Sequence, residues 1–210
     1  MNRFFNNRML LSCSLVIVAL AGFTAFRGAG GSATVGTAAP AFKLVDSQGK
    51  THDLSEYRGQ YVVLEWLNHG CPFVRKHYNS GNMQRLQKEY TARGVVWLSI
   101  NSAAPGKEGY TTAEQANALT AEKGGAATAV LFDSDGTVGH SYGARTTPHM
   151  FVINPEGVVI YNGAIDNRRS TEVADVEGAQ NYVSAALDEA MGGKPVTVAT
   201  TQPYGCSVKY

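Results

Sequence analysis

The side chain best suited to chemistry in this chain is the thiol of Cys71, which lies between an apolar run and a proline. Residues 61–67 are mostly apolar and predict a buried central strand, and Pro72 suits the first turn of a helix. A thiol at a helix start faces unpaired backbone N–H groups and the positive end of the helix dipole. Both favour the thiolate, which is the nucleophilic form, so the pattern predicts a redox-active cysteine rather than an inert buried one.

The residues expected to support Cys71 adjoin it in the sequence. They are Asn68, His69, Gly70, Pro72 and Arg75. Arg75 lies four residues after Cys71 and therefore on the same face of the predicted helix. Glu65, in the preceding strand, has two interpretations. If it is buried, its raised pKa would suit it to proton transfer, whereas at the strand surface it would be an ordinary carboxylate.

A second candidate thiol, Cys206, lies in a glycine-containing turn near the C-terminus. The remaining cysteine, Cys13, lies within an N-terminal segment that has the features of a leader, so an exported mature chain would keep two thiols. Exported domains with two thiols commonly form a disulfide or use the pair in redox chemistry. Cys206 is therefore either a resolving thiol for Cys71 or a structural or free tail thiol.

Strands and helices alternate along the chain. Predicted strands cover residues 41–45, 61–67, 95–100, 129–132, 150–153 and 158–161, and predicted helices cover 72–93, 111–123 and 178–191. The last two strands flank an Asn-Pro-Glu-Gly turn and predict a hairpin. Parallel strands joined by helices, together with this hairpin, predict an α/β fold with a central mixed β-sheet flanked by helices on both faces.

Composition divides the chain into four parts. Residues 1–27 carry Arg3 and Arg8 before an uncharged stretch, 9–26, which predicts a signal peptide or, alternatively, a membrane anchor. Residues 28–39 form a Gly/Ala/Ser/Thr-rich linker, 40–194 the folded domain and 195–210 a C-terminal tail. We therefore expect an exported protein, periplasmic or otherwise extracytoplasmic, with anchoring through residues 9–26 as the alternative.

The overall composition excludes some classes of function. Hydrophobic residues make up 44% of the chain and charged residues 17%, which is enough apolar content for a folded core. The formal net charge is +1 and no long basic run occurs, which argues against nucleic acid as a partner. We expect no cofactor and no resident metal.

Several segments resemble the redoxin superfamily, which includes the alkyl hydroperoxide reductase/thiol-specific antioxidant (AhpC/TSA) proteins and the exported thioredoxin-like reductases. Residues 39–50 and 54–64 are similar to its opening, and the likeness continues through Gly70-Cys71-Pro72 and residues 146–153. It covers about residues 35 to 190. The resemblance implies a thioredoxin-like fold in which Pro148 is a cis-proline facing Cys71, with the Thr147 backbone and His149 close to the thiol.

The chain departs from both branches of this superfamily. Thioredoxin-like reductases carry Cys-x-x-Cys, but Val74 stands where the second cysteine would be. Peroxiredoxins carry Thr or Ser three residues before the reactive cysteine, where this chain has Asn68. They also carry an arginine at the slot that Pro148 fills here. These departures weaken the peroxidase interpretation without removing it.

These residues suggest four functions, which we give from the most to the least favoured. The first is thiol–disulfide exchange through Cys71, with Cys206 as the candidate resolving thiol, protein disulfides as substrates and a thiol as electron donor. The second is a thiol-dependent peroxidase that reduces hydroperoxides. The third is a copper-binding module that uses Cys71, His149 and His69 as ligands. The fourth is a non-catalytic binding domain of the same fold.

Overall fold

The computed structural model describes Met1 and residues 33–210. The predicted leader, residues 1–27, and the start of the linker fall on residues 2–32, which lie outside the described part of the chain except for Met1. No helix among the described residues is long and apolar enough to cross a membrane.

A seven-stranded mixed sheet forms the centre of the molecule, in the order β2-β1-β5-β4-β3-β7-β8. Central β3 pairs in parallel with β4 and antiparallel with β7, and β7 and β8 form the predicted hairpin. The strands are β1 (Lys43–Asp46), β2 (Thr51–Asp53), β3 (Val62–Trp66), β4 (Val96–Asn101), β5 (Ala129–Phe132), β7 (His149–Ile153) and β8 (Val159–Gly163).

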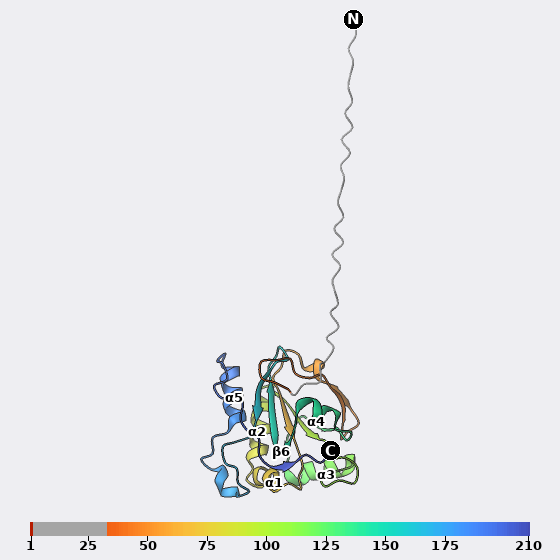
Figure 1. Ribbon diagram of the computed structural model, residues 1–210, viewed down its shortest axis with the longest axis vertical. Coiled ribbons are helices and arrows are strands. Elements are labelled where there is room, and N and C mark those ends of the chain that lie inside the picture. The colour runs from red at the N-terminus through yellow and green to blue at the C-terminus, as the bar shows by residue number, and fades with distance from the viewer. Residues whose placement is uncertain (2–32) are drawn as a thin grey trace.

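Helices cover both faces of this sheet, as predicted (Figure 1). The α-helices within residues 33–210 are α1 (Pro72–Asn79), α2 (Asn82–Ala92), α3 (Ala113–Lys123), α4 (Thr137–Tyr142) and α5 (Tyr182–Met191), with 3-10 turns η1 (Leu54–Tyr57) and η2 (Val173–Val176). The single helix predicted over residues 72–93 is wrong. It is two helices, because Gly81 adopts a left-handed backbone with φ of 74° between them.

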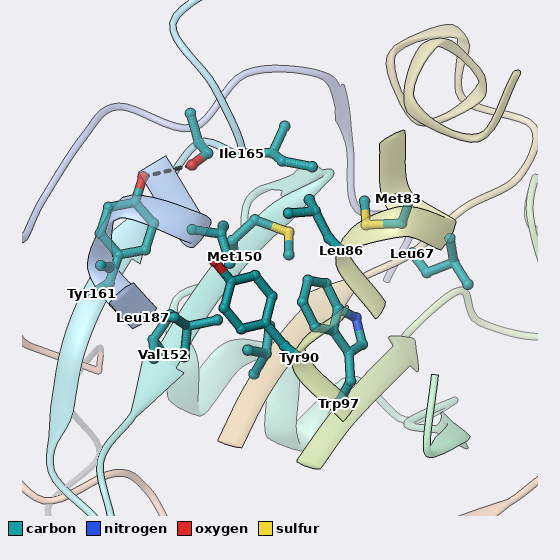
Figure 2. Packing of buried hydrophobic residues seen from close by; sticks show 14 of the residues in the cluster. Leu67, Met83, Leu86, Tyr90, Trp97, Met150, Val152, Tyr161, Ile165 and Leu187 are labelled. Atoms are coloured by element: carbon teal, nitrogen blue, oxygen red, sulfur yellow. Dashed lines mark hydrogen bonds between the residues drawn. The ribbon is translucent and has the colours of Figure 1, made fainter. Parts of the chain in front are cut away.

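Two apolar clusters lie on opposite faces of the sheet because side chains alternate along each strand. On β7, Met150 and Val152 join one cluster with α1, α2 and α5, whereas Phe151 joins the other with α4. Figure 2 shows Met150, Tyr90 and Trp97 packed together in the first cluster. Cys71 belongs to this first cluster.

The C-terminal tail folds back onto the domain. Its strand β9 (Cys206–Ser207) pairs antiparallel with β6 (Thr146–Thr147), next to the start of β7. Farther along, the Tyr210 hydroxyl donates a hydrogen bond to the Ala144 carbonyl at 2.7 Å. Figure 1 shows this blue segment lying beside β6 at the end of the sheet where α1 begins. Two segments far apart in the sequence therefore meet at the end of the central strands.

Candidate active site

The loop after β3 places Cys71 at the start of α1, as the sequence predicts. The Asn68 side-chain oxygen accepts a hydrogen bond from the Gly70 N–H at 2.8 Å, which closes a tight local turn. The Cys71 N–H donates to the Asn68 carbonyl at 3.0 Å, and Cys71 then occupies the N-cap position of the helix. Pro72 is the first residue of α1, where its missing N–H costs no hydrogen bond.

The Cys71 thiol is fully buried, and three backbone features surround it. Its Sγ donates to the Thr147 carbonyl at 3.0 Å and accepts from the Cys206 N–H at 3.4 Å. The Thr147–Pro148 peptide bond is cis, so the structure confirms both the predicted isomer and the predicted proximity of the Thr147 backbone.

Cys206 lies opposite Thr147 in the register of the β6–β9 pair. Both cysteines are free thiols, and the backbone N–H of Cys206 points at the Cys71 sulfur. Gly205 permits this close approach: it has a φ of 136°, and a Cβ built there would lie 2.1 Å from the Thr147 oxygen. A residue with a side chain could not bring the tail this close without a shift of the backbone.

The two thiols have opposite pKa shifts. Burial raises the pKa of Cys71, but hydrogen bonds from the Cys206 thiol, the Cys206 N–H and the Val74 N–H together lower it below its ordinary value. Burial, the same thiol–thiol hydrogen bond and repulsion from the Cys71 charge raise the pKa of Cys206 to about 12. Cys71 is therefore the thiol of the pair that loses its proton first, and Cys206 keeps its proton.

Glu65 is fully buried, which decides between its two interpretations in favour of the buried carboxyl. Burial raises its pKa, although four side chains donate hydrogen bonds that oppose this rise. The donors are Tyr78, Gln87, Trp97 and Ser99, at 2.9 to 3.1 Å. Glu65 thus joins β3 to β4, α1 and α2, and its hydrogen bonds reach these elements rather than the Cys71 thiol.

Four of the predicted supporting residues, Asn68, His69, Gly70 and Arg75, line a cavity of about 360 Å³ beside the loop. Arg75 is exposed at this cavity, whereas His69 packs its ring edge-on against Tyr78 at 4.8 Å. Burial lowers the pKa of His69 to about 4, so its imidazole is neutral at neutral pH. The cavity lies between α1, α3 and the loop that carries Asn68.

The prediction that His149 lies near Cys71 is wrong. Its ring packs at 4.5 Å on Phe151, which belongs to the apolar cluster on the other face of the sheet. Its Nε2 meets the Asn162 side-chain oxygen at 2.8 Å, and its Nδ1 accepts from the Arg145 N–H at 3.3 Å. His149 and Phe151 are two residues apart on β7, so they share a face.

This arrangement does not support the copper hypothesis. His149 faces away from the thiols, and no group of three or more His, Cys, Asp or Glu side chains suited to a metal ion occurs in the described part of the chain.

A buried polar cluster beneath the tail was not predicted from the sequence. It contains Lys76 on α1, Asp166 in the segment after β8, and Tyr204, which precedes Cys206 by two residues. A lysine facing the core side of a helix and an aromatic residue beside the tail cysteine were the available signals.

Comparison with known proteins identifies the family of this chain. Residues 35–162 match the AhpC/TSA family over more than half of the chain. The chain belongs to the AhpC/TSA family. Among curated relatives, this AhpC/TSA protein is 27% identical over 157 residues to the thiol-disulfide oxidoreductase ResA of Geobacillus kaustophilus, covering 72% of this chain and 84% of the relative.

Solved structures agree with the predicted thioredoxin-like fold. A conserved protein of uncharacterised function from Geobacillus kaustophilus has a TM-score of 0.74 at 25% identity, covering 85% of this chain and 93% of its own. The thioredoxin domain of a thiol-disulfide oxidoreductase from Bacteroides vulgatus has a TM-score of 0.51 at 21% identity, and the match covers 70% of this chain and 97% of that domain. The thioredoxin-like fold is confirmed, and the proteins that are similar to this chain include thiol–disulfide oxidoreductases.

Proposed function

We propose that this AhpC/TSA protein reduces protein disulfides with Cys71 as the attacking thiolate and Cys206 as the resolving thiol. The observation that carries the proposal is the contact between the two sulfur-bearing residues. The Cys206 N–H donates to the Cys71 Sγ at 3.4 Å, and the presence of Cys206 lowers the pKa of Cys71. Val74 replaces the helix cysteine of related reductases, so the second thiol comes from the tail.

The reaction has two exchange steps. The Cys71 thiolate attacks one sulfur of the substrate disulfide, forming a mixed disulfide and releasing the first substrate thiolate, which takes up a proton. Cys206 then loses its proton and attacks the Cys71 sulfur. The Cys71–Cys206 disulfide forms, and the second substrate thiolate leaves and is protonated. The substrate gains two electrons, the enzyme pair loses two, and a donor thiol restores the pair.

Access to Cys71 requires movement of the tail. The thiol is fully buried, and β9 covers it by pairing with β6. A two-residue strand pair holds few hydrogen bonds, so the tail is the element that can open while the sheet stays intact. Reduced protein therefore opens to admit a disulfide, and oxidised protein is held closed by the Cys71–Cys206 bond.

The setting we propose is outside the cytoplasm. The predicted leader over residues 1–27 supports export, either with cleavage or with anchoring through residues 9–26. A pair of thiols that cycles through a disulfide also suits an oxidising compartment.

The test uses the full chain with Cys13→Ser, so that two thiols remain. Oxidised glutathione and, separately, hydrogen peroxide are added, and mass spectrometry follows each cysteine. We expect glutathione to yield a Cys71–Cys206 disulfide. In Cys206→Ser the reaction should stop at a mixed disulfide on Cys71, and Cys71→Ser should react far more slowly. Ser207→Ala serves as the matched tail control.

If Cys206→Ser and its parent turned over oxidised glutathione at the same rate, this result would contradict the resolving role of Cys206. A reaction with peroxide that greatly outpaces disulfide exchange would instead identify the protein as a thiol peroxidase.

A further inference from the structure

A buried ion pair lies beneath the C-terminal tail, outside the thiol site. The Lys76 ammonium is 3.6 Å from Asp166 Oδ2, and both side chains are buried. Lys76 also donates to the Arg168 carbonyl at 2.6 Å. Charges persist at such depth only when counter-charges and hydrogen bonds satisfy them.

The tail residue Tyr204 completes this cluster. Its hydroxyl donates to Asp166 Oδ1 and lies 3.3 Å from His77 Nε2. Phe73 packs edge-on against its ring at 5.8 Å, and the Lys76 ammonium lies 5.8 Å from the ring centroid. Burial lowers the pKa of His77 to about 4, so Lys76 supplies the counter-charge to Asp166 at neutral pH.

The geometry links this cluster to the thiols through two short stretches of backbone. Helix α1, which contributes Lys76 and Phe73, begins directly after Cys71. Tyr204 precedes Cys206 by two residues, and Gly205 between them lies against the Thr147 oxygen. One rigid element thus presents the attacking thiol at its start and a binding site for the tail along its side.

We propose that Tyr204 is the positioning residue of the redox pair, anchoring the tail in the buried Lys76–Asp166 site so that Cys206 lies on Cys71. This inference rests on the proposed function. The anchor is a single side chain, and its removal leaves the Lys76–Asp166 pair in place. The tail is therefore held in register and can still be released to admit a disulfide.

The test measures how strongly the fold favours the internal disulfide. The full chain with Cys13→Ser is equilibrated with reduced and oxidised glutathione, where formation of the Cys71–Cys206 bond converts one oxidised glutathione to two reduced molecules. We expect Tyr204→Phe to lower this equilibrium constant about tenfold, because a hydrogen bond to a buried carboxylate is lost while the ring remains. Tyr61→Phe, which removes a hydroxyl that donates to the Ala190 carbonyl, should leave the constant unchanged.

A second measurement separates positioning from general stability. Hydrogen exchange in reduced Tyr204→Phe should quicken in a peptide spanning residues 202–210 and stay unchanged in β3 and β4. An unchanged equilibrium constant in a folded Tyr204→Phe protein would overturn the inference. Global unfolding of the variant would also overturn it, since Tyr204 would then be a core residue. If Cys206→Ser retains full turnover, the proposed function fails first, independently of Tyr204.

Discussion

Gly205 offers the sharpest perturbation of the thiol pair. Its φ of 136° lies in a region that side-chain-bearing residues rarely adopt, and a Cβ there would lie 2.1 Å from the Thr147 oxygen. Such a backbone costs about 1 to 3 kcal/mol for a residue other than glycine. Because the clash falls on the β6–β9 pair, Gly205→Ala should oppose closure of the tail by at least this amount. That corresponds to a loss of about 5- to 150-fold in the equilibrium constant for the Cys71–Cys206 disulfide.

The assay is the glutathione equilibrium, read by mass spectrometry on the Cys13→Ser chain. Gly178→Ala is the matched control, because Gly178 also has a positive φ, of 73°, but nothing lies within 4 Å of a Cβ built there. We expect that control to keep the parent equilibrium constant. A Gly205→Ala protein with the parent constant would refute the reasoning, since the tail would then not need to approach Thr147 to bring the thiols together.

Four further predictions concern single side chains. Cys71 should react with iodoacetamide as a thiolate whose pKa is below that of a free thiol, so the alkylation rate should fall only as pH drops through that lowered value. Cys206→Ala should raise the pKa of Cys71, because it removes the side-chain donor at position 206. Glu65→Leu should lower the free energy of unfolding by about 3 kcal/mol or more, measured in urea, because four buried donors lose their acceptor. Glu65→Gln should gain stability relative to the parent as pH rises above about 4.3, because burial raises the pKa of the folded carboxyl and ionisation then opposes folding. His149→Ala should leave the pH profile of Cys71 alkylation unchanged, because its ring packs on the opposite face of the sheet; an altered profile would contradict that placement.

Local patterns predicted much of the fold. The apolar run before Cys71 is the central strand β3, and Pro72 begins α1. The hairpin of β7 and β8 and the mixed sheet also match the prediction. The break at Gly81 was missed because helical periodicity continues across it, whereas a single left-handed residue is enough to end a helix.

Local sequence signals are enough to identify the attacking group, because a strand, a short turn and a proline suffice to place the Cys71 thiol at a helix N-terminus. The groups that meet that thiol depend instead on the folded arrangement of distant segments. That arrangement brought Cys206 onto Cys71 across most of the length of the chain, turned His149 to the other face, and buried Lys76 with Asp166 beneath Tyr204. The physical reason is that helix and strand signals act over a few residues of backbone. Pairings between distant segments depend instead on how the packed elements bring buried polar groups together, so that each finds a hydrogen-bond partner or a counter-charge.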